Sequence, residues 1–434
     1  SITPPCVEAP GSSCTLGLTK RPQHSGPDSS DDPVIKTIDI LNYKSVDKLQ
    51  LELGRVNLFV GENGCGKTNI LEAIGLAAAS AAGRLENEFL ISRGIRVAGP
   101  DRMRSGFTST TSNEQIRIVV HGEAQSTKDS RVFKAYLQND NSPYGQWEDE
   151  VLQGILQALP PGEAEAMTSH FIGDQSLTTP LTDFRDQLAS LGLPKSVRDT
   201  AANSFAKILV IKALLNRMAK DIGLTGFITY TPHEDALRDL SRESNIEPIG
   251  LHGEGLFKLL SNLSQDQLEE LQRYLRLIHW FDGFQLSAAA HSEKTIHVVD
   301  QYLGDGIKNF DQRSANEGFL FLLLYAALLI SSHTPRFFAV DNVDASLNPK
   351  LSASVIKMFV EATKKHDRQV LLTTHNPGAL DGLDLQDPEQ RLFVVYRNVE
   401  GRTRIRRIER EPGEHLPRLS EAFLQGYLGG LPNH

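Results

Sequence analysis

Hydrophobic and polar positions alternate with a period of two in several short stretches near the start of the chain. Residues 34–41 read V-I-K-T-I-D-I-L, residues 49–53 alternate again, and residues 55–60 form a short apolar run that leads into glycines. These patterns predict three strands. From Thr68 to Ala82 apolar positions recur with helical spacing among many alanines, which predicts a helix that packs closely against a neighbouring element.

In the middle of the chain the pattern changes from strands to polar helices. We expect strands at 115–121 and 131–137, followed by a polar, helical stretch from about residue 150 to residue 225. That stretch is the candidate for an inserted helical arm. Apolar spacing then predicts helices at 253–263 and 265–280. The sequence shows no internal repeat.

From Ser314 to about Val395 helical and strand patterns alternate, which is typical of an α/β core. The longest uninterrupted apolar run, 319–330, has twelve residues. A membrane span needs about 18–20 residues, so we interpret this run as a buried helix and expect no membrane partner. Two further strands are expected at 391–397 and 402–409.

Composition excludes several classes of protein. Apolar residues make up 40% of the chain and charged residues 23%, which is ordinary for a globular protein. The net charge of −9 excludes a uniformly basic nucleic-acid coat but allows a local basic patch. Three cysteines make no disulfide framework and no secretory signal pattern opens the sequence, so we expect a cytoplasmic protein. Six of the 21 prolines fall in residues 1–33, where we expect a disordered tail.

The strongest chemical signal is a phosphate-binding loop. Residues 61–68, G-E-N-G-C-G-K-T, match G-x-x-x-x-G-K-[ST] between a predicted strand and a predicted helix, as the motif requires. Glycines let backbone N–H groups converge on phosphate oxygens at the N-terminus of a helix. We therefore predict a nucleotide site, with Lys67 on the β- and γ-phosphates and the Thr68 hydroxyl on Mg²⁺. The predicted nucleotide-binding residues of the loop are Gly61, Asn63, Gly64, Gly66, Lys67 and Thr68.

Such a loop needs an acidic partner at the end of a buried strand to hold Mg²⁺. Residues 337–341 read F-F-A-V-D, four apolar positions and then a carboxylate. We therefore predict that Thr68 and Asp341 hold the metal. Taken alone, the pattern would also fit a strand that ends in a turn aspartate.

The motifs resemble those of ABC-type ATPases of the RecF, SMC and OLD group. Residues 42–45, N-Y-K-S, and 69–74, N-I-L-E-A-I, are similar to the segments that flank the phosphate loop in these families. The resemblance covers the chain from about residue 34 onward and is weakest at 100–230. It implies an ABC-type P-loop ATPase core, a mixed α/β sheet flanked by helices, with ATP and Mg²⁺ as ligands and Asn69 in the nucleotide site.

Three later motifs follow the order of that group. S-A-N-E-G at 314–318 lies 27 residues before Asp341, where the ABC signature motif belongs, and D-N-V-D-A-S-L-N at 341–348 is similar to the D-loop. His375 ends an apolar strand 34 residues after Asp341, like the switch histidine. In the family, a signature motif touches the γ-phosphate held by a second subunit, so the resemblance implies a homo-oligomer with nucleotide at its interfaces. The signature residues assigned to the nucleotide are Ser314, Asn316 and Gly318.

One position departs from the family pattern. The residue after the Mg²⁺ aspartate is normally a glutamate that activates the attacking water, and here it is Asn342. An amide accepts no proton at neutral pH, and losing a general base typically costs about 10²–10⁴-fold in rate. We therefore expect slow or absent hydrolysis, unless a carboxylate from elsewhere substitutes. The predicted catalytic group is Lys67, Asp341, Asn342 and His375.

Other candidate sites carry weaker signals. Arg273 and His279 have the loose spacing of HEPN ribonucleases, but an amphipathic helix produces such spacing readily. H-G-E-G at 252–255 resembles an element of OLD-like ATPases and equally fits a tight turn at a helix start. Only 59 residues follow His375, so we expect no Toprim nuclease within this chain, and no Cys/His spacing supports a zinc site.

Two sets of arginines can bind nucleic-acid phosphate, form a solvated face or bind an acidic partner. The first alternates along one predicted strand and therefore shares one face of it. The second lies in a short segment after the first helix. The two sets are Arg402, Arg404 and Arg406, and Arg93, Arg96, Arg102 and Arg104.

At the finest level, residues 341–349 and 427–432 resemble the ATPase of the Septu antiphage defence system, with the PARIS-type ATPase as a relative. This resemblance implies a separate nuclease partner of HNH or Toprim type. A repair or DNA-end-binding ATPase of RecF or SMC type, with nucleic-acid-stimulated hydrolysis, stays open. So does an autonomous toxin with a nuclease in residues 100–230.

We expect four parts along the chain. They are the tail at 1–33, an ATPase lobe with the P-loop at 34–150, a helical insertion at 151–225, and an ATPase lobe with the signature, the Mg²⁺ aspartate and the switch histidine at 226–434.

Overall fold

The structure is a computed structural model in which residues Asp32–His434 form one compact unit. The tail expected at 1–33 lies outside the described residues, as do residues 152–153, 155–174 and 191–193 of the expected insertion. The described residues are 35–107, 114–124, 127–142, 145–151, 154, 175–190, 194–241, 248–287, 294–304, 309–409 and 418–429.

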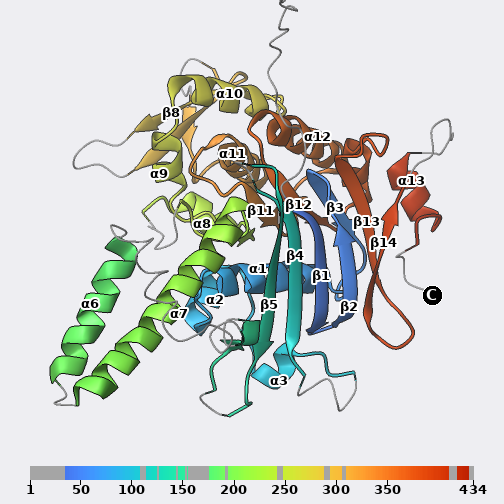
Figure 1. Cartoon of the computed structure of the whole chain (residues 1–434). Helices are drawn as coiled ribbons and strands as arrows, with labels where there is room; N and C mark the ends of the chain where they lie inside the picture. The colour runs from blue at the N-terminus through green and yellow to red at the C-terminus, as the bar shows by residue number, and fades with distance from the viewer. Residues whose placement is uncertain are drawn as a thin grey trace, which may run out of the picture. The chain divides into compact units, whose positions relative to one another are not determined.

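A six-stranded sheet forms the centre of the α/β core (Figure 1). Its strands are β3 (Val56–Val60), β7 (Thr229–Tyr230), β11 (Phe337–Val340), β12 (Gln369–Thr374), β13 (Gln390–Arg397) and β14 (Thr403–Ile408). The strand order is β14-β13-β3-β12-β11-β7. All neighbours are parallel except β14, which runs antiparallel to β13. Every residue of β3, β11 and β12 is buried, as expected for parallel strands that are covered on both faces.

A second, five-stranded sheet is antiparallel throughout and has the order β2-β1-β4-β5-β6. Its strands are β1 (Ile35–Tyr43), β2 (Val46–Glu52), β4 (Ile116–Glu123), β5 (Ser130–Gln138) and β6 (Glu148–Asp149). Alternate positions of β4 are buried, because one face of this sheet covers the core. The strands predicted from alternation near residues 34, 49, 115 and 131 are therefore confirmed.

Helix α1 (Lys67–Ala81) packs between the two sheets and contacts strands of both. Its small residues are almost all buried, which explains the alanine-rich sequence. The opposite face of the six-stranded sheet is covered by α10 (Gln265–Leu275), α11 (Glu317–Ile330) and α12 (Pro349–Lys365). Residues 318–330 of α11 are all buried, as the apolar run predicted. No helix in the described part of the chain is long and apolar enough to cross a membrane.

Two helices occupy much of the segment expected to form an arm. They are α6 (Gln175–Ser190) and α7 (Lys195–Asp221), and they pack together through stacked rings of Phe184 and Phe205, whose centroids are 4.2 Å apart. Helix α7 also contacts α1 and β5. Six short elements complete the helices described: α2 (Asn87–Ser92), α3 (Pro100–Met103), α8 (Glu234–Arg238), α9 (Leu256–Ser261), η2 (Pro377–Gly382) and α13 (Leu419–Leu424).

The sequence interpretation missed a third sheet. Strands β8 (Phe281–Ser287), β9 (Thr295–Asp300) and β10 (Asn309–Asp311) form an antiparallel sheet of order β10-β9-β8. The helix predicted at 265–280 ends earlier, at Leu275, because the chain turns there and enters β8. This small sheet leads directly into the signature segment.

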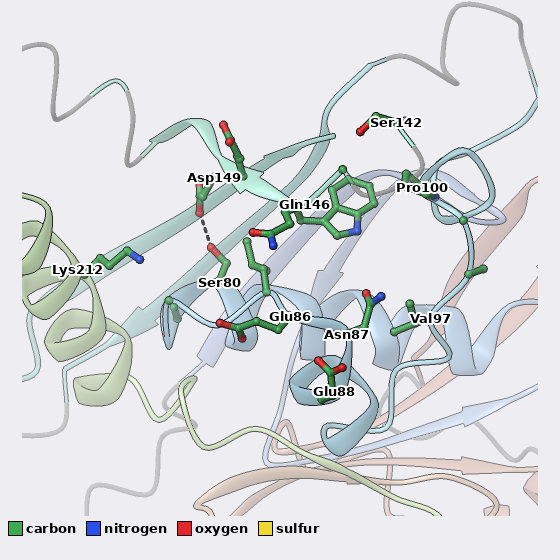
Figure 2. A pocket seen from close by; sticks show the side chains of 18 of the residues that line it. Ser80, Glu86, Asn87, Glu88, Val97, Pro100, Ser142, Gln146, Asp149 and Lys212 are labelled. Atoms are coloured by element: carbon green, nitrogen blue, oxygen red, sulfur yellow. Dashed lines mark hydrogen bonds between the residues drawn. The ribbon is translucent and has the colours of Figure 1, made fainter. Parts of the chain in front are cut away.

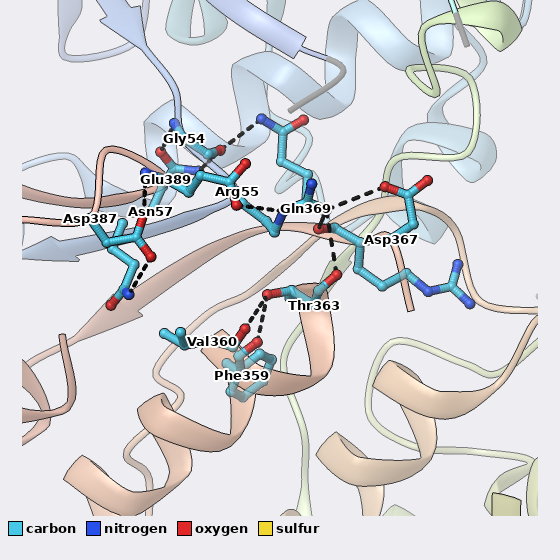
Figure 3. A network of polar contacts seen from close by, with 12 residues as sticks. Gly54, Arg55, Asn57, Phe359, Val360, Thr363, Asp367, Gln369, Asp387 and Glu389 are labelled. Atoms are coloured by element: carbon cyan, nitrogen blue, oxygen red, sulfur yellow. Dashed lines mark hydrogen bonds and ion pairs between the residues drawn. The ribbon is translucent and has the colours of Figure 1, made fainter. Parts of the chain in front are cut away.

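A buried polar network holds the amino ends of the parallel strands together (Figure 3). Arg55 donates from Nε to Glu389 at 3.0 Å and pairs through Nη1 with Asp367 at 3.3 Å. The Asn57 side chain, fully buried, bonds the backbone of Gly54 in both directions at 2.8 Å. These contacts join β3 to the strands on either side of it, at the end opposite the phosphate loop.

Candidate nucleotide site

Three predicted motifs meet at one edge of the six-stranded sheet. The phosphate loop follows β3, Asp341 follows β11, and His375 follows β12, which lies between them. Because these strands are parallel, their carboxyl ends lie at the same edge, where α/β proteins bind ligands. The structure therefore brings Lys67, Thr68, Asp341, Asn342 and His375 into one region.

Two glycines of the phosphate loop lie so close to other backbone and side-chain atoms that a side chain would not fit there. Gly66 has φ 111°, and a Cβ there would lie 2.2 Å from Oγ1 of Thr403. A Cβ on Gly61 would lie 2.1 Å from the carbonyl oxygen of Val395. Thr403 also donates to the carbonyl oxygen of Cys65 at 2.8 Å, so β13 and β14 form the wall behind the loop.

Lys67 folds back onto its own loop. Its ammonium group donates to the carbonyl oxygens of Gly61 at 2.8 Å and Glu62 at 3.0 Å, and lies 3.4 Å from Nδ1 of His375. Burial lowers the pKa of Lys67, although the nearby Cys65 and Asp341 oppose that effect. Partial burial, and then the positive charge of Lys67, lower the pKa of His375.

Thr68 and Asp341 form a pair of oxygen donors suited to a hard cation. The Thr68 hydroxyl donates to Oδ2 of Asp341 at 2.9 Å, and the Thr373 hydroxyl donates to Oδ1. Mg²⁺ is typically held by one or two such protein oxygens together with water and substrate phosphates. The described residues contain no group of three or more His, Cys, Asp or Glu that could hold a metal alone. The residues present therefore fit a metal that binds with a nucleotide.

A cavity of about 400 Å³ lies beside the phosphate loop. Its positively charged lining residues, Lys67, Arg96 and Arg397, suit an anionic ligand. None of the described residues that line it carries a carboxylate. The lining residues are Asn63, Gly64, Gly66, Lys67, Thr68, Asn69, Arg96, Asn342, His375 and Arg397.

Asn342 occupies the position of the missing glutamate and faces this cavity. Its backbone has φ 56°, a left-handed conformation that asparagine adopts more readily than most residues. Apart from the adjacent Asp341, the nearest carboxylate along the chain is that of Asp344, which does not line the cavity. It accepts the backbone N–H of His375 at 3.4 Å instead.

The signature residues lie elsewhere. Ser314, Asn316 and Gly318 are absent from the cavity lining, and they stand at the N-terminus of α11. Asn316 caps that helix by accepting the N–H of Phe319 at 2.8 Å. A Cβ on Gly318 would lie 3.2 Å from the carbonyl oxygen of Ser346, so the signature packs against the D-loop of the same chain. The structure does not join the signature to the phosphate loop within one chain.

Two arginines that line the nucleotide cavity were not predicted from the sequence as nucleotide-site residues. Arg96 pairs with the buried carboxylate of Glu72 at 2.6 Å and reaches Asn69 at 3.3 Å. Arg397 donates to the carbonyl oxygen of Gly64 at 2.8 Å. Arg397 ends β13, which pairs with β3, so its position depends on a strand pairing that no local pattern reveals.

The two predicted arginine sets do not form continuous basic faces. Arg104 is 1% exposed and donates to the carbonyl oxygen of Asn139 at 2.6 Å, and Arg96 belongs to the nucleotide cavity. Arg402 pairs with Asp47 at 2.8 Å, which ties β14 to β2 of the other sheet. Arg104 and Arg402 therefore have internal partners, whereas Arg96 lines the nucleotide cavity.

The remaining motifs make local contacts. Arg273 pairs with Glu361 at 2.8 Å, whereas Nδ1 of His279 contacts the Tyr302 hydroxyl at 3.0 Å, so the two residues have separate partners. In H-G-E-G, Gly253 and Gly255 have positive φ, and Gly255 caps α9. This is the tight turn at a helix start that the sequence suggested.

A larger cavity of about 1010 Å³ lies at the other end of α1 (Figure 2). It is lined by the end of α1, α2, the loop before α3, the β5–β6 connection and α7. Ser80 bonds Asp149 on its wall. No phosphate-loop residue lines it, so it is separate from the nucleotide cavity.

The fold and the site define a P-loop ATPase core of the ABC type. A sequence profile described as AAA domain matches residues 37–279, which is more than half of the chain. The chain therefore belongs to the AAA-domain family. A second profile, described as AAA domain, putative AbiEii toxin, Type IV TA system, matches residues 198–381. ATPases of this kind generally use ATP with Mg²⁺.

Curated relatives match shorter stretches. The DNA replication and repair protein RecF of Phocaeicola vulgatus is 36% identical over 135 residues, which cover 30% of this chain and 33% of that protein. RecF of Clostridium beijerinckii is 54% identical over 41 residues, which cover 9% of this chain and 11% of that protein. The chain thus spans a third or less of the length of these relatives.

A solved structure resembles the fold over most of its length. The SMC head bound to the C-terminal winged-helix domain of ScpA has a TM-score of 0.52 and 12% sequence identity, covering 87% of this chain and 98% of that one. This confirms the predicted fold class, an α/β ATPase core with a mixed sheet flanked by helices.

Proposed function

We propose that this chain is the ATP-binding subunit of a bacterial antiphage defence complex. ATP controls subunit assembly and a partner nuclease, and its hydrolysis is slow or absent. The observation that carries this proposal is the lining of the nucleotide cavity, in which cationic groups face the ligand and no described carboxylate does. Such a cavity can hold a triphosphate but offers no carboxylate to take a proton from water, and Nδ1 of His375 faces the Lys67 ammonium.

Within that site the proposed roles follow the geometry. Lys67 exchanges its loop carbonyls for the β- and γ-phosphates, and Thr68 and Asp341 hold Mg²⁺. Because the Lys67 ammonium faces Nδ1 of His375, that nitrogen accepts and Nε2 carries the proton. His375 is then a neutral donor toward the γ-phosphate. The proposed nucleotide contacts are Gly61, Asn63, Gly64, Gly66, Lys67, Thr68 and Asn69.

We propose further that a second copy completes the site with Ser314, Asn316 and Gly318. This is supported by their absence from the cavity of their own chain. A helix N-terminus carries a partial positive charge, and that of α11 suits a γ-phosphate. ATP would then stabilise the assembly, because its phosphates bind two chains at once.

The defence role has two supports. The profile that matches residues 198–381 is described as a putative AbiEii toxin, and residues 341–349 resemble the Septu ATPase. A partner nuclease of HNH or Toprim type would supply the cleavage, in the cytoplasm. Copurification of a tagged chain with proteins encoded beside it, followed by an assay of DNA and RNA cleavage with and without ATP, tests this directly. Full ATP-independent cleavage by the isolated chain would contradict it.

A second function is favoured by the RecF relatives. A repair ATPase of RecF or SMC type would hydrolyse ATP faster when nucleic acid is present. Turnover measured with and without single- and double-stranded DNA separates the two functions. An increase of about tenfold or more on adding DNA would support the repair ATPase, and no increase supports the defence subunit.

A further inference from the structure

The segment before the signature motif is bonded reciprocally to helix α8. Arg238, the last residue of α8, donates from Nη1 to the carbonyl oxygen of Gln312 at 3.1 Å and also to that of Arg313. Gln312 donates from Nε2 back to the carbonyl oxygen of Arg238 at 3.2 Å. Ser314, the first signature residue, follows directly.

Gln312 has a second partner that fixes the segment from the other side. Its Oε1 accepts the N–H of Ile296 in β9 at 2.9 Å, and the residue is only 2% exposed. A buried amide is stable only when its polar atoms are bonded. The side chain of Gln312 therefore ties the signature segment to α8 and to the three-stranded sheet at once.

Helix α8 is in turn connected to the strand that carries Asp341. It follows β7, which pairs with β11, and the N–H of Asp341 donates to the carbonyl oxygen of Tyr230 at 2.9 Å. His233, at the start of α8, donates its backbone N–H to the carbonyl oxygen of His252 at 3.1 Å. The two imidazole rings stack with centroids 4.2 Å apart, so the H-G-E-G turn braces α8.

We infer that Arg238 and Gln312 form a clamp that sets the position of the signature motif relative to the Asp341 strand of the same chain. This inference rests on the proposed function, in which the signature of one chain completes the nucleotide site of another. The cavity of one chain binds ATP. The clamp fixes where the signature motif of that chain stands in the site shared with the neighbouring chain. Arg238 is thus a positioning residue, and it does not line the cavity.

The ion pair between Arg238 and Glu234, whose charged atoms are 2.6 Å apart, lies within α8 and does not hold the signature segment. The two residues are four apart on a partly exposed helix, where such pairs contribute little. Nη1 makes both bonds to the successive carbonyl oxygens while Nε bonds Glu234, so two nitrogens fixed in one plane contact the two segments, which lysine with its single nitrogen cannot reproduce. The geometry is therefore specific for arginine.

The test compares Arg238→Ala and Arg238→Lys with the unmodified chain and with Arg276→Ala, a control on an exposed arginine at the end of α10. Two quantities are measured: the dissociation constant of Mg²⁺-ATP at protein concentrations below assembly, and the mass in solution with Mg²⁺-ATP at higher concentrations. We expect the dissociation constant of Mg²⁺-ATP to agree within about twofold among all four chains. The dissociation constant of the assembly should increase about tenfold in Arg238→Ala and by a smaller factor in Arg238→Lys. It should not change in Arg276→Ala.

A mixing experiment separates the clamp from a general loss of structure. Arg238→Ala keeps an intact P-loop and Lys67→Ala keeps an intact signature, so one composite site in a mixed pair is undamaged. At a protein concentration at which neither variant assembles alone, we expect the mixture to assemble with ATP, at one nucleotide per pair.

Each contrary outcome has its own meaning. Arg238→Ala that assembles like the unmodified chain overturns the clamp and leaves the proposed function intact. Loss of ATP affinity in isolated Arg238→Ala, or no recovery in the mixture, shows a structural role and also overturns the clamp. Failure of the unmodified chain to assemble with ATP overturns the proposed function itself, and the clamp with it.

Discussion

The ammonium group of Lys67 lies 3.4 Å from Nδ1 of His375, 308 residues further along the chain. Both groups face the nucleotide cavity. The contact requires a neutral imidazole whose Nδ1 accepts, because two positive charges at this distance would repel. The phosphate loop and His375 are therefore electrostatically coupled.

This coupling predicts a pH dependence of stability. Partial burial, followed by the charge of Lys67, lowers the pKa of His375 below its ordinary value. The unfolded chain then binds the proton more readily, so the histidine's contribution is complete above about pH 6.5 and is lost as pH falls through the lower, folded pKa. We expect His375→Gln to lose less stability than the unmodified chain between pH 7.5 and 5.5, measured by urea unfolding. Equal losses in both proteins would contradict the coupling.

Replacement of Lys67 separates binding from folding. Lys67→Met keeps the apolar stem but removes the ammonium group, which burial already disfavours. We expect ATP affinity to fall about 100-fold or more, since at least two charge-assisted hydrogen bonds to phosphate are lost. The melting temperature should stay within a few degrees of the unmodified chain. Calorimetric titration with Mg²⁺-ATP and a thermal melt check the two halves of this prediction.

Two glycines of the phosphate loop form a matched pair. Gly66→Ala places a Cβ 2.2 Å from Oγ1 of Thr403, whereas nothing lies within 4 Å of a Cβ at Gly64. Both have positive φ, so each substitution costs about 1–2 kcal/mol in backbone strain. Only Gly66→Ala adds a steric clash, and it should lower the free energy of unfolding clearly more than Gly64→Ala. Denaturant titration of both variants decides it, and a larger loss in Gly64→Ala would be incompatible with this loop geometry.

The network around Arg55 predicts a stability effect far from the site. The Arg55 side chain is 5% exposed and that of its partner Glu389 is 17% exposed. Arg55→Ala leaves this carboxylate nearly unpaired in a desolvated position, which should reduce the free energy of unfolding by about 3 kcal/mol. The control is Arg84→Ala, whose exposed pair with Glu86 spans 3.8 Å and should contribute less than about 0.5 kcal/mol. Equal effects of the two variants on denaturant midpoints would refute the role of the network.

Much of the site could be predicted because each motif is local. A run of apolar residues followed by Asp341 or His375 is visible in the sequence. Because the strands are parallel, their carboxyl ends then lie at the same edge of the sheet. The positions of Arg397 and Arg104 could not be predicted in the same way. Arg397 reaches the cavity through the pairing of β13 with β3, and Arg104 is buried by the hairpin that contains Asn139. The three-stranded sheet was missed because its strands are short and carry many polar residues between their buried positions.

The left-handed backbone at Asn342 limits what a restored glutamate can do. At φ 56° a glutamate costs about 1 kcal/mol more than asparagine, and its carboxylate must still reach the attacking water. We therefore expect Asn342→Glu to increase turnover, but by less than the full 10²–10⁴-fold that a general base typically contributes. Asn342→Gln is the matched control, because it has the same length without the carboxylate and should leave turnover unchanged.

We propose that ATP is held at a subunit interface rather than consumed. The most direct measurement is ATP turnover by the purified chain, made beside its mass in solution with and without Mg²⁺-ATP. We predict turnover of about 0.01 s⁻¹ or slower together with a larger, nucleotide-dependent assembly. Turnover near 1 s⁻¹ or faster, or a mass that does not respond to ATP, would contradict the account.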